Sequence, residues 1–172
     1  LTLAILAAFG PAAAAFAQAP PSKPVSVTVE NFSRAESDLY FFGIVRNGGF
    51  GKFDHTRGPA PLDKQTVIRL NRDTLYSSAV FDLDAGPVTI TIPDAGQRFI
   101  SMQVINEDHY THQVAYKPGS YTLTRENVGT RYVAVAFRTL ADPADKKDME
   151  QAHAVQDAIK VEQSGGTGKF EV

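Results

Sequence analysis

Apolar and polar residues alternate over a long stretch, residues 66–138, and this pattern constrains the fold more than any other feature of the chain. Successive side chains of a β-strand point to opposite faces, so alternation indicates strands with one buried face. Residues 88–92 are the clearest case, because three apolar residues alternate with two threonines. Turn-forming segments such as residues 84–87 separate about seven such strands. We expect mainly antiparallel β structure, as a sandwich or a partly closed barrel.

Helical periodicity flanks this stretch on both sides, which makes the expected fold class α+β. Apolar residues recur at steps of three and four within residues 29–46 and within residues 142–162, the spacing of one helix face. We expect this N-terminal helix to be a core element and the C-terminal helix to lie on the surface. The apolar stripe of the first helix consists of Phe32, Ala35, Leu39 and Phe42, and its apolar face is widened by Tyr40, Phe41, Ile44 and Val45. The stripe of the second consists of Met149, Ala152, Val155 and Ile159.

The N-terminal segment, residues 1–17, has the pattern of an export signal. An apolar run is followed by small residues that end in Ala15-Phe16-Ala17, which fits a signal peptidase site. A bilayer-spanning helix needs about 20 apolar residues, so this run is too short to be an anchor. The chain starts without Met or a basic segment, so we expect the signal peptide to be truncated at its start. We predict a periplasmic or secreted protein with no integral membrane segment after signal removal.

The rest of the chain divides into three parts. Residues 18–24 form a Pro-rich leader, and residues 25–162 are long enough for one domain with its own core. Residues 163–172 are rich in glycine and indicate a linker toward a C-terminal domain of the same protein. We expect the chain to be a fragment that lacks this domain.

Composition and missing motifs exclude several functional classes. The net charge of −2 gives no reason to expect nucleic acid as a partner. The sequence contains no cysteine, which rules out disulfides, thiolate nucleophiles and cysteine-ligated zinc. It also lacks the G-x-S-x-G pattern of serine hydrolases and the glycine-rich patterns of phosphate and dinucleotide sites. We therefore expect no cofactor.

The densest polar cluster within apolar surroundings is Asn71-Arg72-Asp73, with Tyr76 close behind. One interpretation is a turn between strands, in which the Asn and Asp side chains bond nearby backbone. The other is a ligand site, in which the turn presents these side chains to a cleft. Arg72 would then hold a carboxylate or sugar acid bidentately, oriented by Asp73. His55, in the preceding loop with charged neighbours, indicates either a loop network or the edge of a site.

A second cluster, Glu107, Asp108, His109 and His112, follows a strand of mostly apolar residues. These residue types suit acid–base catalysis, and they are also ligands for zinc. Side chains three residues apart diverge in an extended chain, so the spacing does not support a metal site and we predict none. The interpretations left open are an acid–base role, a polar-ligand role and a solvated loop.

Three stretches together resemble one bacterial family, domain of unknown function 1254. The stretches are VENFSRAESDLYFF, LNRDTLYSSAVFDLDAGPVTITIPD and RFISMQVINEDHYTHQVAYKPGSYTL. The resemblance covers roughly residues 25–162, and its most specific parts are NRDTLYSSAVFDL and INEDHYTH. It implies a β-rich fold and frequent export, with a second β-rich domain, domain of unknown function 1214, commonly following. It supplies no agreed activity, but it places Asn71, Arg72, Asp73 and Tyr76 within the family's pattern.

Three functions fit these observations, and we favour the first. This is a binding or accessory module for a small polar ligand, with a cleft formed against the C-terminal domain. The alternative is a hydrolase or isomerase in which His109 or His112 acts as base beside Glu107 or Asp108. The third is a structural protein of the envelope, for which no pocket is expected.

Overall fold

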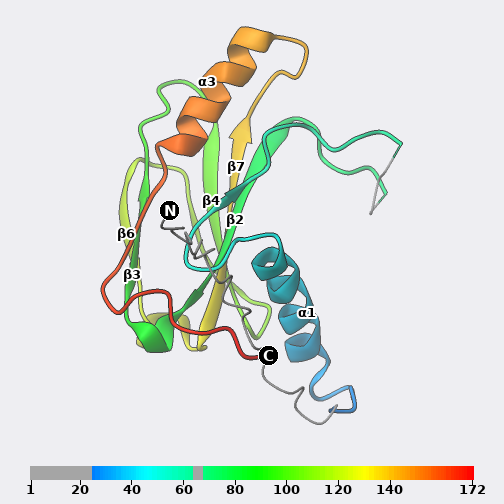
Figure 1. Cartoon of the computed structure of the whole chain (residues 1–172), viewed down its shortest axis with the longest axis vertical. Helices are drawn as coiled ribbons and strands as arrows, with labels where there is room; N and C mark the ends of the chain where they lie inside the picture. The colour runs from blue at the N-terminus through cyan, green and yellow to red at the C-terminus, as the bar shows by residue number, and fades with distance from the viewer. Residues whose placement is uncertain (1–24, 64–67) are drawn as a thin grey trace, which may run out of the picture.

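Two β-sheets packed face to face make up the fold (Figure 1). The computed structural model describes residues 25–63 and 68–172, so the predicted signal peptide and Pro-rich leader lie outside the described residues. One sheet consists, in spatial order, of β1 (Asp54–His55), β2 (Thr74–Asp82), β7 (Tyr132–Leu140), β4 (Ile100–Asn106) and β5 (Thr111–Ala115). The other consists of β6 (Gly119–Leu123), β3 (Val88–Ile92) and β8 (Lys160–Gln163). The helices are α1 (Phe32–Arg46), α2 (Arg125–Val128) and α3 (Lys146–Asp157), with a 3-10 turn at Leu83–Ala85.

The core lies between the two sheets, and its burial pattern confirms the alternation in the sequence. β3 buries all three of its apolar residues and leaves both threonines partly exposed. The inward side of β2 contributes Ala79 and Phe81, which pack in the same core cluster as Met102 and Phe137. The expected class, α+β with mainly antiparallel strands, is confirmed. The sheets stay separate in the described part of the chain, so the sandwich applies rather than the barrel.

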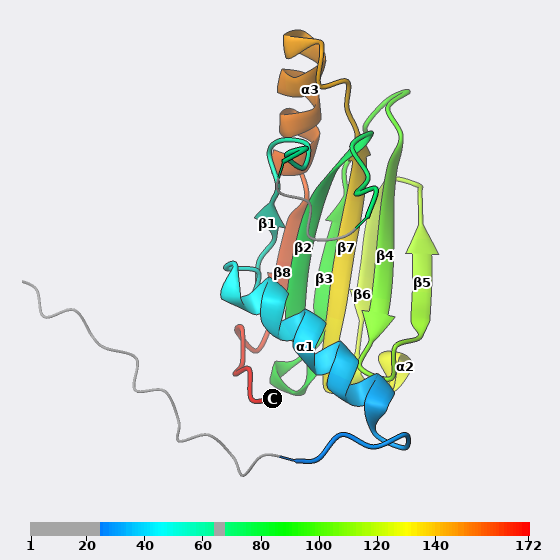
Figure 2. The same cartoon turned by 90° about the vertical axis from the view of Figure 1, so that its right-hand side faces the viewer.

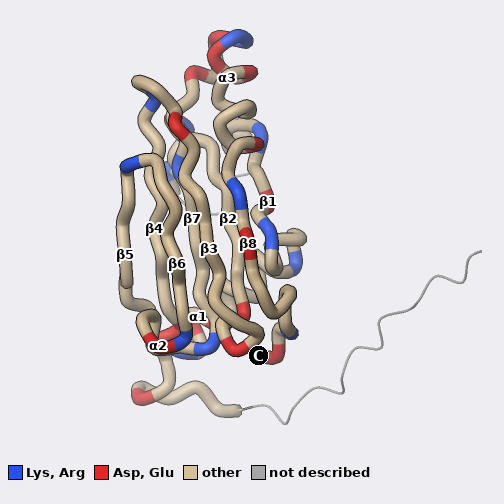
Figure 3. The backbone as a smooth tube through the Cα atoms, turned by 90° about the vertical axis from the view of Figure 1, so that its left-hand side faces the viewer, with Lys and Arg blue, Asp and Glu red and all other residues tan. Residues whose placement is uncertain are grey.

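The outer face of the three-stranded sheet carries hydroxyl groups rather than charges on β3 and β6 (Figure 3). Thr89 and Thr122 are joined across the two strands by a hydrogen bond of 3.0 Å between their hydroxyls, and Thr91 and Ser120 by another of 3.0 Å. Such cross-strand pairs stabilise the sheet.

α1 crosses the outer face of the five-stranded sheet near one end (Figure 2). The prediction that its apolar stripe faces the core is wrong, because Phe32 is 55% exposed, Leu39 63% and Phe42 47%. The helix instead buries Phe41, which packs on Val80 of β2. Large apolar side chains lie on both sides of α1, so periodicity alone could not identify the buried side.

α3 is shorter than the helix expected over residues 142–162. It begins after Asp145, whose side chain accepts a hydrogen bond from the backbone N–H of Lys147, and residues 160–163 instead form β8 beside β3. Of the predicted stripe, Ala152 is fully buried on the helix, and Ile159 enters the core beyond its end. None of the helices in the described part is long and apolar enough to cross a membrane.

Residues 163–172, predicted to be a linker, lie against the domain. The Phe170 ring is 4.9 Å from the Tyr132 ring and 5.8 Å from the Phe50 ring, centre to centre. The backbone N–H of Lys169 donates to a carboxylate oxygen of Asp82 at 3.1 Å. The segment is therefore part of the folded unit, while the expectation that it leads to a further domain stays a prediction.

Candidate functional site

The candidate site lies on the outer face of the five-stranded sheet, on the part that α1 leaves uncovered (Figure 2). Residues directly opposite each other in neighbouring strands project to the same face. Two rows of such residues cross β2, β7 and β4, and the second row lies nearer α1. The rows are Tyr76–Arg138–Ser101 and Ser78–Ala136–Gln103. These six residues are called the open face below.

Arg138 is the charged group of the open face. Its guanidinium carbon lies 5.5 Å from the centre of the Tyr76 ring, within range of a cation–π contact. The side chain is exposed, and it forms no ion pair with any carboxylate in residues 25–63 and 68–172. Asp54 lies on the same side of the sheet, but on β1, at the level of Ser78. An exposed guanidinium can hold a carboxylate through two parallel hydrogen bonds.

Asn71 and Tyr76, two of the four predicted ligand residues, are brought together beside this arginine. The side-chain NH₂ of Asn71 donates to the hydroxyl of Thr74 at 2.6 Å and to the hydroxyl of Tyr76 at 3.1 Å. Its carbonyl oxygen accepts the backbone N–H of Asp73 at 2.8 Å, which closes the turn before β2. Because the Tyr76 hydroxyl accepts from Asn71, its own proton is available to a ligand.

Arg72 and Asp73, the other two predicted ligand residues, do not join them. Arg72 donates a hydrogen bond to the backbone carbonyl of Ala60 and so holds the loop before β2. Asp73 is exposed, and its backbone carbonyl accepts the N–H of Ala141 at 3.0 Å. The cation of the candidate site is therefore Arg138 rather than Arg72. The sequence feature that could have identified Arg138 is a charged residue at an outward position of a mostly apolar strand.

The predicted acid–base cluster lies at the turn after β4, against α1. One guanidinium nitrogen of Arg34 is 2.9 Å from a carboxylate oxygen of Glu107, and the other is 2.5 Å from Asp108. The second carboxylate oxygen of Glu107 accepts the backbone N–H of Tyr132 at 2.8 Å. Both carboxylates are therefore engaged in joining α1 to the sheet.

The histidines of this cluster do not meet a carboxylate. Nδ1 of His109 lies 3.2 Å from the hydroxyl of Ser37, a residue that is 1% exposed. His109 has a φ of 67°, in the left-handed region, and His112 is exposed on β5. No group of three or more acidic or histidine side chains in the described part of the chain is arranged to hold a metal ion.

Asp38 of α1 completes the surroundings of this cluster. Burial, and then the negative charge of Glu107, raises the pKa of Asp38. One of its carboxylate oxygens is buried without a hydrogen-bond partner. Sequence analysis gave no signal for this group, because it comes from α1 and meets the turn only in the folded chain.

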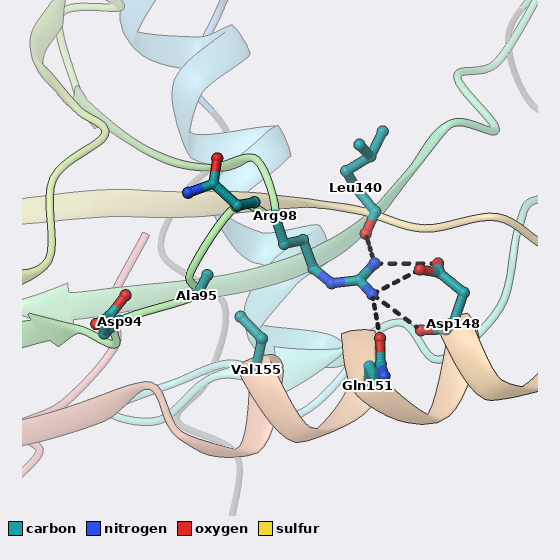
Figure 4. Close-up of a pocket in the computed structure, with 8 residues that line it drawn as sticks. Asp94, Ala95, Arg98, Leu140, Asp148, Gln151 and Val155 are labelled. Atoms are coloured by element: carbon teal, nitrogen blue, oxygen red, sulfur yellow. Dashed lines mark hydrogen bonds and ion pairs between the residues drawn. The ribbon is translucent and has the colours of Figure 1, made fainter.

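A pocket of about 520 Å³ lies elsewhere, between the β3–β4 connection and α3 (Figure 4). The guanidinium of Arg98 dominates it, donating to the backbone carbonyl of Leu140 at 2.6 Å and to both carboxylate oxygens of Asp148 at 2.6 and 3.0 Å. The same group donates to Gln151 at 3.2 Å. Arg98, and then the backbone N–H of Asp142, lowers the pKa of Asp148 to about 2. Arg98 and Asp148 pair with each other, and their contact fastens α3 to the sheet, while Asp94 also lines the pocket.

His55 belongs to a network that joins β1 to α3. Its Nδ1 lies 2.8 Å from the hydroxyl of Ser77, which also accepts a hydrogen bond from Gln156 at 3.1 Å. Ser77 and Gln156 are fully buried. Burial, and then the charge of Arg57, lowers the pKa of His55. Of the two interpretations left open for His55, the structure favours the network.

The architecture has a counterpart of known structure. It is similar to the crystal structure of the VPA0106 protein from Vibrio parahaemolyticus, with a TM-score of 0.61 and 19% sequence identity over 83% of this chain and 39% of that one. At this identity the likeness shows the fold alone, and the present chain spans less than half the length of that relative. No curated protein matches the chain.

Family membership follows from the sequence of the domain itself. A family described as "Protein of unknown function (DUF1254)" matches residues 50–163, which is about two thirds of the chain and includes every strand from β1 to β8. The matched region contains the open face and the acid–base cluster together, so the resemblance noted from the sequence is confirmed. The chain therefore belongs to the DUF1254 family.

Proposed function

We propose that this protein is an exported binding or accessory module that holds a small polar ligand on the open face. One observation carries the proposal: the exposed guanidinium of Arg138 lies over the Tyr76 ring, beside the Asn71 turn, without an ion-pair partner among the described residues. A cation in that position supplies binding energy and orientation for an anionic or polar group.

The neighbouring groups support a ligand of small size. The Tyr76 hydroxyl can donate a hydrogen bond, and the half-buried Ser78 offers a further hydroxyl on the same face, whereas Ser101 is buried beside Arg138. Ala136, in the centre of the second row, has a small and half-buried side chain between Ser78 and Gln103. A ligand that bridges Arg138 and Tyr76 would meet groups of both donor and acceptor character.

The enzyme alternative has less support. Both carboxylates of the Glu107–His112 cluster contact Arg34, and the imidazole of His109 contacts a serine hydroxyl. A general base of the predicted type needs an imidazole oriented by a carboxylate beside a space for substrate.

The partner included in the proposal is a C-terminal domain of the same protein. The exposed apolar stripe of α1 supports it, because large apolar patches mark interaction surfaces. The segment that ends at Val172 runs beside this helix, with Phe170 in the same cluster as Phe41. Hydrogen exchange tests the proposal. The amides of α1 should be better protected in a longer natural form of the protein that includes a C-terminal domain than in the 172-residue chain, and equal protection would count against the proposal.

Export is tested on the natural host. The proposal expects the protein in the periplasmic or secreted fraction, with Gln18 as its N-terminal residue after cleavage. Recovery of the protein only from the cytoplasm, with residues 1–17 still attached, would contradict it.

Ligand binding is tested by titration calorimetry and thermal shift with acetate, succinate, glucose and glucuronate as probes. At least one probe should bind, and Arg138→Gln should weaken that binding. Arg46→Gln serves as the matched control, because Arg46 is an exposed arginine at the end of α1. If no small acid or sugar binds in a way that depends on Arg138, Tyr76 or Asn71, the proposal fails.

A further inference from the structure

Exposed apolar side chains continue the outer face beyond Arg138, toward β5. Phe99 lies opposite Leu140, whose backbone N–H donates to the Phe99 carbonyl at 3.0 Å. The ring of Tyr116 lies 6.1 Å from the ring of Phe99, and Val114 lies opposite Gln103. Large apolar residues gathered on one exposed face mark a place of contact. The four residues are called the apolar flank; they are Leu140 (44% exposed), Phe99 (45%), Val114 (45%) and Tyr116 (60%).

The apolar flank and the cation are neighbours on one surface. Leu140 follows Arg138 by two residues on β7, so both side chains project outward, and Ser101 lies opposite Arg138 on β4. Strands are spaced about 4.8 Å apart, so the flank on β5 lies about 10 Å from β7. One charged group and one aromatic patch thus lie within the span of a single small molecule.

We infer that the ligand of the open face is an amphipathic carboxylate, with its carboxylate on Arg138 and its aryl or alkyl body on the apolar flank. The inference rests on the function proposed above and specifies the ligand class. A fully polar ligand would leave the flank exposed to water, and an uncharged apolar ligand would leave Arg138 without a partner. An aryl acid matches both halves of the surface at once.

The surroundings favour a small molecule over a protein partner. α1 on one side and the described residues before β2, 56–63 and 68–73, on the other both stand out from this side of the sheet (Figures 1 and 2). A flat protein surface would meet these elements before it reached the sheet. The occupant that best fits a single cation beside an aromatic pair is therefore a small acid.

Titration calorimetry of the 172-residue chain tests the inference with four probes: 3-phenylpropionate, 3-phenylpropanamide, acetate and glucuronate. The phenyl acid should bind about tenfold or more tightly than acetate, which lacks the contact with the apolar flank. It should also bind about tenfold or more tightly than the matched amide, which lacks the charged contact with Arg138. Arg138→Gln should weaken the phenyl acid by about tenfold and leave the amide unchanged. Phe99→Ser should weaken the phenyl acid and leave acetate unchanged.

Arg46, at the end of α1, and Val29, just before this helix, are exposed and provide matched controls. Arg46→Gln and Val29→Ser remove a charge and an apolar side chain away from the open face and should bind the phenyl acid as the parent does. Circular dichroism melts show whether each variant folds. If Arg138→Gln does not fold, Arg138→Lys replaces it in the test. This variant keeps the positive charge but loses the two parallel hydrogen bonds of a guanidinium, so it should bind the phenyl acid with intermediate affinity.

The outcomes separate this inference from the proposed function. If acetate or glucuronate binds as tightly as the phenyl acid and still depends on Arg138, the amphipathic class is wrong and the binding module stands. If no probe depends on Arg138, both are wrong. If ultracentrifugation shows a dimer that Phe99→Ser dissociates, a second copy of the chain covers the flank and the inference is also wrong.

Discussion

Arg34 of α1 holds Glu107 at the end of β4, with a guanidinium nitrogen 2.9 Å from the carboxylate oxygen. The Glu107 side chain is 6% exposed, and its other oxygen accepts the backbone N–H of Tyr132 at 2.8 Å. Because the predicted apolar stripe of α1 faces outward, the helix is attached to the sheet by the contacts of Arg34 with both carboxylates of this turn and by an apolar cluster. The residues of α1 in that cluster are Phe41, Ile44 and Val45.

Glu107→Ala should lower the free energy of unfolding by about 2 kcal/mol, because it leaves the buried N–H of Tyr132 without an acceptor. Asp108→Ala is the matched control, since Asp108 contacts the same arginine but is 51% exposed. Asp108→Ala should lower the free energy of unfolding by less than about 1 kcal/mol, the usual range for exposed ion pairs. Urea unfolding measures both, and equal losses would mean that the Tyr132 contact adds nothing.

Asp38→Asn should stabilise the protein at neutral pH. Burial and the charge of Glu107 raise the pKa of Asp38, so the folded state disfavours its ionised form. The stability that depends on its protonation is fully present below the ordinary pKa of 3.8 and is lost as pH rises through the raised value. Removing the charge should raise the free energy of unfolding at pH 7 by about 0.5 kcal/mol, the scale of contacts between partly exposed charges.

Thermal melts of the parent and Asp38→Asn between pH 3 and pH 7 measure this effect. The gap between the two should be largest at pH 7 and should close near pH 3, where both side chains are neutral. Glu36→Gln, on the same helix, is the matched control. An Asp38→Asn variant that melts below the parent at pH 7 would contradict the assignment.

Asp148→Asn should lower the melting temperature by several degrees at pH 7, because it weakens the contact of α3 with Arg98. The pKa of Asp148 is lowered from 3.8 to about 2 in the folded state, so its contribution is present above about pH 4 and is lost as pH falls toward 2. Melts at several pH values should show the parent and the variant converging over that interval. Glu150→Gln, an exposed position on α3, should follow the parent throughout, and a constant gap for Asp148→Asn would contradict the prediction.

Strands such as β3 could be predicted because one face is buried and the other is partly exposed. Val88–Ile92 alternates in sequence because it alternates in burial. The buried side of α1 could not be predicted in this way, because the helix carries Phe41 on one side and Leu39 on the other. Which of these two apolar sides is buried depends on the contact with the sheet. β8 was missed because residues 160–163 directly follow the last apolar residue of the predicted helix stripe, Ile159, and their pairing with β3 is a contact between distant parts of the chain.

The site was half predictable for a related reason. Asn71 and Tyr76 lie within one turn and strand, so local sequence is enough to group them. Arg138 joins them only through the register of β2 with β7, which no local pattern specifies. Adjacency in sequence predicts Arg72 as the cation of the site, but its side chain donates a hydrogen bond to the backbone carbonyl of Ala60 in the preceding loop.

Gly165→Ala should destabilise the protein, which tests whether the C-terminal segment is part of the fold. A Cβ at this position would lie 1.4 Å from the backbone carbonyl oxygen of Ala85, so the segment would have to move away from the 3-10 turn. Overpacking of this kind costs about 1–3 kcal/mol. Gly43→Ala is the opposite case, because a Cβ there meets nothing within 4 Å and the site is inside α1. It should stabilise the protein by about 0.5–1 kcal/mol. In urea unfolding the two variants should therefore move in opposite directions, whereas a free linker would tolerate Gly165→Ala without any loss.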